Sequence, residues 1–271
     1  VYTLAGALYA ARTGDAAITT KTQNAIMSVQ GSGYARVLEM SRNITDYVIA
    51  ADIVGLNSSD TASFKSFVSG LRTKALQGHS GGKNMYETAQ FSANNWGSMS
   101  RAAMAAIDVY LGDRTQLQEI ATTMRIWLGE SGTNKLVVTS TSWRASAGDI
   151  GINRRGATIQ GHNVDGVQPE DQRRTGEFSW PAAKGSYPWE SLQGAIVAMQ
   201  IMVRAGVISP TAGDNAMVRA YDWLYTVNSN PAAGDDTSQP WIANKMFGTN
   251  YPTPAASIGK NMGWTDWTHA K

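Results

Sequence analysis

The chain has 271 residues, of which 42% are hydrophobic, and a formal net charge of +2 from 23 basic and 21 acidic residues. This length can bury a large core as one domain, which we expect to span residues 1–271, and the dispersed charge excludes a basic tract of the kind that binds nucleic acid. Because the chain has no cysteine, and only three histidines with no HxxxH or HxH pair, we expect no disulfide, metal site or cofactor.

The start of the chain carries no membrane or targeting signal. No stretch approaches the roughly 18 apolar residues that would span a bilayer, so we expect no membrane insertion. The opening "VYTLAGALYAARTGD" has a helical pattern from its first residues and lacks a charged segment before it. We therefore expect native sequence upstream of Val1, and a signal peptide is one candidate for it.

The first half of the chain has the pattern of long helices. All eight prolines lie between Pro169 and Pro254, so the residue that most strongly breaks helices is missing from the first 168 positions. After an opening helix, "TGD" at 13–15 supplies a glycine stop and a new start. Apolar residues then recur at the i, i+3, i+4, i+7 spacing of a buried helix face, at Ile44, Tyr47, Val48 and Ala51 and again at Leu117, Ile120, Ala121 and Met124.

Two further apolar stripes flank an irregular middle segment. The first runs from Met99 to Leu111 and ends at "GD" (112–113); the second runs from Leu192 to Met202 and ends at Gly206. "KLVVTSTSW" at 135–143 is the one fair strand candidate. The fold class is therefore all-α, built of antiparallel helix hairpins arranged as a bundle, a solenoid or a toroid, and the long segments 129–190 and 229–271 are candidates to carry function.

The stretch "NNW" at 94–96 precedes the Met99 stripe. Asn94 lies where a helix N-cap belongs, which is its structural interpretation. Two adjacent amides exceed what a cap needs, and an amide at the positive end of a helix is suited to holding a carboxylate. Trp96 is either a core residue or, in a groove, a platform for a sugar ring.

The second constellation lies at 161–206. Its polar first half crowds acidic and basic side chains with His162 into thirteen residues, which is also typical of a solvated loop whose arginines pair with its own acids. Aromatic residues interleave with these charges, as in the lining of a carbohydrate groove. They are Phe178, Trp180, Tyr187 and Trp189.

These motifs resemble the alginate-lyase-type polysaccharide lyases. "DGVQPEDQRR" followed by "YPWESLQGAIVAMQIMVRAG" is similar to the family's Asp-Gly, Pro, acidic residue and Arg ahead of a Tyr that leads into an apolar helix, and "NNW" is similar to its Asn-Asn-His. "LAGALYAARTGD" and "GKNMGWTDWTH" extend the resemblance to most of the chain. The matching positions are Asp165, Gly166, Pro169, Asp171, Arg174 and Tyr187.

The sequence departs from this family at two places. Trp96 stands where the family often has histidine, and the gap from Arg174 to Tyr187 is several residues longer than we expect. His162, which lies just ahead of "DG", is a candidate replacement for the missing histidine, and its alternative is a purely structural role.

The resemblance implies an incomplete (α/α) toroid that cleaves a 4-linked uronic acid polysaccharide, glucuronan or alginate, by β-elimination. Asn95 would hold the uronate carboxylate, Tyr187 would transfer the proton, and a cation at Arg174 would favour the phenolate. His162 would be the second acid or base if the proton and O4 lie on opposite faces. We assign substrate binding to Asn94, Trp96, His79, Arg173, Trp180 and Trp189.

Two other functions fit the same residues. An (α/α)-barrel glycoside hydrolase would need two carboxylates across a groove, for which Asp165, Glu170, Asp171 and Glu190 are candidates. A non-catalytic glycan-binding domain would use the aromatic groove without chemistry. With the lyase we expect an anionic polysaccharide as partner, a monomer, and secretion or export to the periplasm, because the substrate is a polymer.

Overall fold

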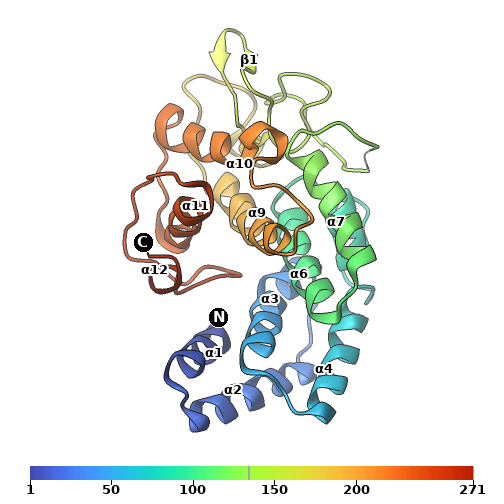
Figure 1. The fold of residues 1–271 in the computed structure, drawn as a ribbon. Helices are drawn as coiled ribbons and strands as arrows, with labels where there is room; N and C mark the ends of the chain where they lie inside the picture. Colours follow the sequence, from blue (N-terminus) through green and yellow to red (C-terminus); the bar gives the residue numbers. More distant parts are fainter. Residues whose placement is uncertain (134, 271) are drawn as a thin grey trace.

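The computed structural model describes residues 1–133 and 135–270, and it confirms an all-α fold with 58% helix and 3% strand. Figure 1 shows α6 and α9 near the centre, α1 and α2 at one end, and the hairpin that contains β1 at the other. The helices are α1 (Tyr2–Thr13), α2 (Ala16–Ser28), α3 (Val37–Val54), α4 (Ser58–Leu71), α5 (Met85–Phe91), α6 (Asn95–Leu111), α7 (Arg114–Trp127), α8 (Pro169–Gln172), α9 (Tyr187–Arg204), α10 (Ala212–Asp222), α11 (Gln239–Phe247) and α12 (Thr265–Thr268).

The predicted "GD" turns end one helix and start the next. Gly14 and Gly112 have left-handed φ angles of 71° and 75°, which a glycine adopts without steric cost, at the C-termini of α1 and α6. The following aspartates cap the next helices: Asp15 accepts hydrogen bonds from the first turn of α2, and Asp113 from the first turn of α7. These hairpins confirm the helix boundaries predicted from the sequence.

Helices α3, α6 and α9 lie side by side and run in the same direction. Ser41 Oγ of α3 lies 3.3 Å from Ser100 Oγ of α6, and Asn95 at the start of α6 contacts Glu190 in the first turn of α9. Gly194 allows the closest approach, because a Cβ added there would lie 2.5 Å from the Met99 backbone nitrogen. The N-termini of the three helices are therefore gathered at one end of this three-helix group.

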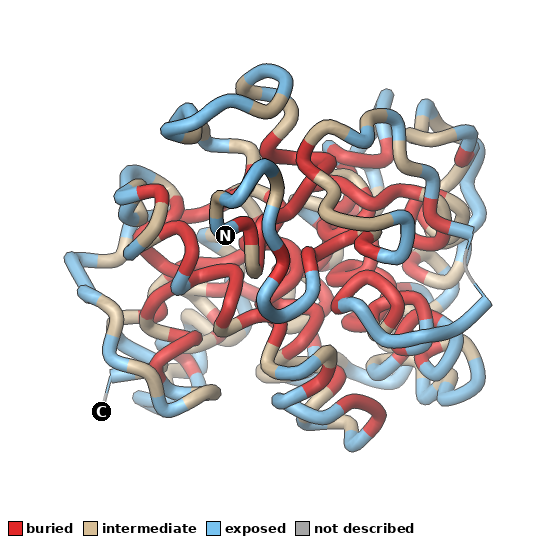
Figure 2. The backbone as a smooth tube through the Cα atoms, turned by 90° about the horizontal axis from the view of Figure 1, so that it is seen from above, coloured by how far each residue is buried: buried red, intermediate tan, exposed pale blue. Residues whose placement is uncertain are grey.

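Helix α6 is the centre of the core. Every residue from Gly97 to Asp108 is buried, so the helix is enclosed on all sides rather than along the single apolar stripe that the sequence predicted. Its Arg101 is fully buried and donates hydrogen bonds to the carbonyls of Ala89 and Ser92. Figure 2 shows the buried backbone in the middle of the molecule and the exposed backbone around it.

The strand prediction for 135–143 is wrong. That segment forms only an isolated bridge between Val137 and Ser92, and the two-stranded antiparallel sheet pairs β1 (Thr158–Ile159) with β2 (His162–Asn163). The long segment after α7 is held by the buried side chain of Asn153, whose amide donates to the carbonyls of Trp143 and Val164. Side-chain hydrogen bonds thus replace the predicted strand pairing.

None of the helices in the described residues combines the length and the apolar character needed to cross a membrane.

Candidate functional site

The start of α6 confirms the capping role of Asn94. Its backbone is extended, and its side-chain oxygen accepts a 3.0 Å hydrogen bond from the Trp96 N–H. A Cβ at Gly97 would lie 1.9 Å from the Ser92 carbonyl oxygen, so the preceding chain packs directly on the first turn. This packing leaves both asparagines buried.

The cap also fixes the protonation of a neighbouring histidine. Because the Asn94 oxygen faces Trp96, its Nδ2 points at His79 Nε2, 3.2 Å away, and must donate to it. His79 Nδ1 lies 2.8 Å from Ser80 Oγ and carries the proton in this arrangement. Burial lowers the pKa of His79; Glu170 opposes this shift, and the cations Arg173 and Arg174 add to it. His79 is therefore a neutral imidazole.

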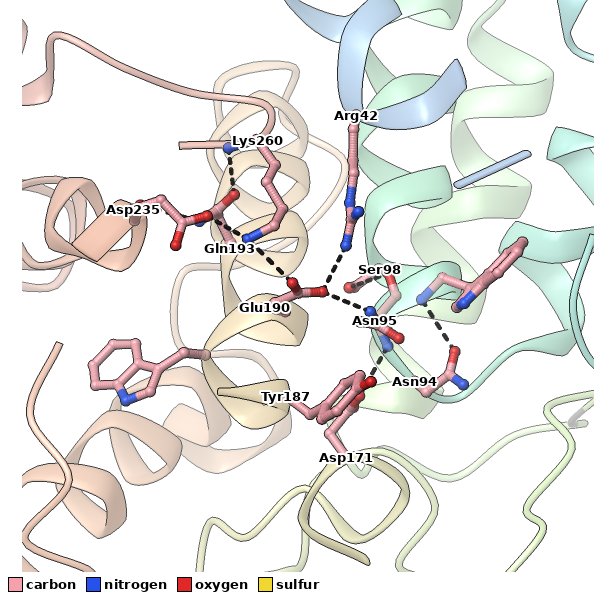
Figure 3. Close-up of polar contacts among 12 residues, drawn as sticks. Arg42, Asn94, Asn95, Ser98, Asp171, Tyr187, Glu190, Gln193, Asp235 and Lys260 are labelled. Atoms are coloured by element: carbon pink, nitrogen blue, oxygen red, sulfur yellow. Dashed lines mark hydrogen bonds and ion pairs between the residues drawn. The ribbon is translucent and has the colours of Figure 1, made fainter. Parts of the chain in front are cut away.

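Asn95 connects α6 to two carboxylates. Its backbone N–H donates to Asp171 Oδ1 at 3.1 Å, and its side-chain Nδ2 donates to Glu190 Oε2 at 2.8 Å (Figure 3). Asn95 is only 2% exposed. The carboxylate that its amide holds therefore belongs to the protein, whereas the sequence predicted that Asn95 would hold a uronate carboxylate directly.

Glu190 is surrounded by cations from distant parts of the chain. Arg42 Nη2 of α3 lies 2.6 Å from Glu190 Oε2, and Lys260 Nζ lies 3.1 Å from Oε1 and also pairs with Asp235. In Figure 3 Glu190 lies between Arg42 and Lys260, with Asn95 beside it. Two cations and two carboxylates thus form a neutral cluster at the N-terminal ends of α3 and α9.

Asp171 is the buried acid of the site. The residue is fully buried, and this burial raises the pKa of Asp171 to about 7, while its hydrogen bond from the Asn95 N–H acts in the opposite direction. Arg101, also fully buried, has its pKa lowered to about 9 by burial. The Asp171 carboxyl is therefore enclosed by protein at the start of α6 and is closed to solvent.

Arg174 and Tyr187 form the predicted pair in spite of the long gap between them. Arg174 Nη2 donates to the Tyr187 hydroxyl at 3.0 Å, and the guanidinium lies 4.1 Å from the ring centroid. The two ends of the intervening loop are in close contact, because a Cβ added at Gly185 would lie 2.4 Å from Thr175 Cγ2. The additional residues between Arg174 and Tyr187 extend this loop outward and do not separate the two side chains.

His162 is not the histidine that meets the asparagine pair. It lies in β2, where its ring stacks on Trp180 with the centroids 4.6 Å apart and has Phe178 at 6.3 Å. The histidine beside the asparagine pair is His79, whose ring also lies 5.6 Å from that of Trp96. His79 comes from the loop before α5, and no sequence motif links it to "NNW".

Trp189 is a core residue, which corrects its assignment to substrate binding. It is 2% exposed, packs against Tyr221 and Tyr225, and donates its indole N–H to the Asn230 carbonyl. Trp180, in contrast, is exposed on the loop between Arg174 and Tyr187. Of the two tryptophans, Trp180 therefore has ring surface open to solvent, although one face stacks on His162.

The other charged residues of the motif are paired. Arg173 donates to Glu170, whose carboxylate also accepts the backbone N–H groups of Thr139 and Ser140. Asp165 accepts from Arg219 at 2.5 Å. The Glu170–Arg173 pair is the kind of ion pair that the solvated-loop interpretation predicted, whereas the partner of Asp165 is Arg219 of α10, outside the motif.

Sequence reasoning missed Arg42 and Lys260. Arg42 lies between helix residues with no motif around it, and Lys260 follows a glycine in the C-terminal segment, so only the fold brings them to Glu190. Within the described residues, no group of three or more histidine, aspartate or glutamate side chains is arranged to hold a metal ion. Comparison of the chain with protein-family models, curated proteins and solved structures gave no match.

Proposed function

We propose that the protein is a polysaccharide lyase that cleaves a 4-linked uronic acid polysaccharide by β-elimination. The observation that carries this proposal is the Arg174–Tyr187 pair, in which a guanidinium donates to the phenol oxygen at 3.0 Å. This contact places a cation beside the oxygen that would carry the proton. Tyr187 is half-buried and Arg174 is exposed, so a polymer can reach both.

The reaction needs one proton to move from C5 to O4. The Tyr187 phenolate would take the C5 proton, the electron pair of that bond would form the C4–C5 double bond, and the C4–O4 bond would break. If both groups lie on one face of the sugar, the same phenol would return the proton to O4. If they lie on opposite faces, His79 is the candidate base, because its ring is neutral and lies beside Trp96 at the start of α6, and the Tyr187 phenol would then donate its proton to O4.

The arrangement of helices supports an incomplete (α/α) toroid as the framework. Helices α3, α6 and α9 run parallel, and α6 packs against α7, the helix that follows it in the chain. In a toroid of this kind the parallel helices form the inner layer, so their N-termini would surround the substrate groove. Helix N-termini also favour the negative charge of a polyuronate.

Glycoside hydrolysis is the second candidate, because two carboxylates, Asp171 and Glu190, both contact Asn95. A hydrolase needs one protonated acid and one ionised base, and the pKa of Asp171 at about 7 suits the acid. The complete burial of Asp171 argues against direct contact with a glycosidic oxygen. We therefore favour elimination.

The test is absorbance near 235 nm during incubation with glucuronan, polymannuronate, polyguluronate, hyaluronan and an uncharged glucan. A rise on a polyuronate, with none on the glucan, is the expected result, because elimination creates a 4,5-unsaturated sugar. New reducing ends without this absorbance would establish hydrolysis instead. Binding without either product would leave a glycan-binding domain.

A further inference from the structure

Glu190 has the surroundings of a bound carboxylate. Its two oxygens accept from a guanidinium, an amide and an ammonium group, at 2.6, 2.8 and 3.1 Å (Figure 3). Charge-assisted bonds from arginine and lysine are the contacts by which proteins recognise carboxylates. The donors Arg42, Asn95 and Lys260 come from α3, α6 and the C-terminal segment, so the fold assembles a carboxylate site that none of these segments makes alone.

The two cations are open to solvent and the amide is not. Arg42 is 26% exposed, Lys260 25% and Glu190 17%, whereas Asn95 is enclosed. Arg42 also has a buried Nε that lacks a hydrogen-bond partner among the described residues. A carboxylate that arrives from solvent can therefore meet the two cations while the amide keeps Glu190 nearby.

The cluster lies at the right place for the proposed chemistry. Tyr187 and Glu190 are three residues apart in the first turn of α9, so they share one face of the helix, with Cβ atoms about 5–6 Å apart. In a uronic acid the carboxylate is attached to C5, the atom that loses its proton. A carboxylate held beside Glu190 would thus present the C5 proton toward the Tyr187 side of the helix.

We propose that Arg42 and Lys260 bind the carboxylate of the uronic acid at the cleavage site, and that Glu190 occupies these cations until the substrate displaces it. The proposal rests on the proposed polyuronate cleavage and names the residues that select an acidic sugar over a neutral one. Glu190 is then a resident competitor: its negative charge keeps the cations paired in the free protein and weakens substrate binding. Arg42 and Lys260 act in the opposite sense.

The experiment is calorimetric titration with β-1,4-linked tetraglucuronate, with tetramannuronate in parallel and cellotetraose as the neutral counterpart. All proteins carry Tyr187→Phe so that the oligomer is not consumed. The test variants are Arg42→Met, Lys260→Met, Glu190→Gln and the double variant Arg42→Met/Glu190→Gln. Arg12→Met, which removes an exposed cation from the last turn of α1, is the matched control.

We expect Arg42→Met and Lys260→Met each to weaken uronate binding about tenfold, because each removes one charge-assisted contact. Glu190→Gln should strengthen it severalfold, and the double variant should return to within about threefold of the parent. Binding of cellotetraose should not change, nor should Arg12→Met alter either ligand. A merely structural cluster would instead weaken both ligands in every variant.

The outcomes separate the two proposals. If the parent binds uronate and Arg42→Met and Lys260→Met bind it equally well, the carboxylate site is overturned and the proposed lyase activity is not affected. Glu190→Gln that binds uronate more weakly, with melting temperature unchanged, would overturn the competitor role. A parent that binds no uronate, together with wild-type protein that produces no 235 nm absorbance, would overturn the proposed function and this site with it.

Discussion

The two ends of the α3, α6 and α9 group differ sharply in chemistry. At the N-terminal end lie Glu190, its cations and the buried Asp171. At the other end the same three helices, with α1 and α11, line an apolar cavity of about 460 Å³ whose walls include Ala106, Val197 and Met262. The apolar end holds the cavity, whereas charged and hydrogen-bonding groups converge at the N-terminal end, where we propose that proton transfer takes place.

The difference has a physical origin in the direction of the helices. Parallel helices place their free N–H groups at one end and their free carbonyls at the other. The N-terminal end therefore favours anions such as carboxylates, and the C-terminal end favours cations. Acids and amides gather at the first end here, at Asn95 and Glu190. The following predictions test whether chemistry belongs to this end alone.

The largest effect is expected for Tyr187→Phe, which removes the proposed proton carrier at the N-terminal end. Turnover on the preferred polyuronate should fall about 100-fold or more, with oligomer binding retained. Tyr110→Phe, in the wall of the apolar cavity, is the matched change at the opposite end and should keep wild-type turnover. Initial rates at 235 nm measure both. Retention of more than about a tenth of the activity in Tyr187→Phe would exclude it from the mechanism.

Gly194→Ala should destabilise the packing of α6 against α9, and so affect both the N-terminal end and the apolar cavity. Its Cβ would lie 2.5 Å from the Met99 backbone nitrogen, so α6 and α9 must separate, at a cost of about 3 kcal/mol in the free energy of unfolding. Gly70→Ala in α4 is the control, because a Cβ there meets nothing within 4 Å and alanine favours the helix. Denaturant unfolding measures both variants. If Gly194→Ala and Gly70→Ala are equally stable, the close contact of α6 with α9 at Gly194 is not needed for stability.

Asp171 should make the N-terminal end sensitive to pH. Its pKa is about 7 in the folded protein and near the ordinary 3.8 when unfolded, so its stabilising contribution is present at low pH and lost as pH rises through about 7. At about 1.4 kcal/mol for each pKa unit, the loss between pH 4 and pH 8 is up to about 4 kcal/mol.

Asp171→Asn should remove that part of the pH dependence, as measured by unfolding free energies at pH 4, 6 and 8. The difference from wild type is the quantity to compare, because burial also raises the pKa values of Asp108 and Asp236 to about 7. Asp52→Asn, at the exposed edge of the apolar cavity, should follow the wild-type pH profile. If the unfolding free energy of Asp171→Asn changes with pH in the same way as that of the wild type, Asp171 is not a buried protonated acid.

The smallest effect is expected for Asn94→Ala, at about 1 kcal/mol of stability for a lost N-cap. Asn57→Ala, which removes the cap of α4, should cost a similar amount. Only Asn94→Ala also removes the amide that donates to His79 Nε2, so the pKa of His79 should rise toward its ordinary value in that variant. NMR titration of the histidine ring measures this shift. An unchanged His79 pKa would show that the amide does not fix the tautomer.

Local signals in the sequence predicted much of the fold. Helix ends at Gly14 and Gly112 follow from the free backbone of glycine and the capping aspartate after it, which act over four or five residues. The strand prediction at 135–143 failed because Asn153, ten residues beyond the end of the segment, supplies the hydrogen bond that holds Trp143. A propensity measured over nine residues does not contain that partner.

The candidate site was predicted only where its residues share a motif. Arg174 and Tyr187 were paired correctly because the motif carries both, and the loop between them closes at Gly185. The position of His162 just ahead of "DG" favours it over His79 as the site histidine, but in the fold its ring stacks on Trp180. The position of Trp189 after a loop predicts a groove residue, but the first turn of α9 directs its side chain into the core.

The sequence by itself determined the helices, their caps and turns, and the chemical types gathered near 94–96 and 165–190, because each depends on interactions between near neighbours in the chain. Tertiary structure decided which groups meet. The contact of Glu190 with Arg42, Asn95 and Lys260 joins positions up to 148 residues apart in the chain. Such contacts depend on the packing and direction of whole helices, so no local pattern specifies them.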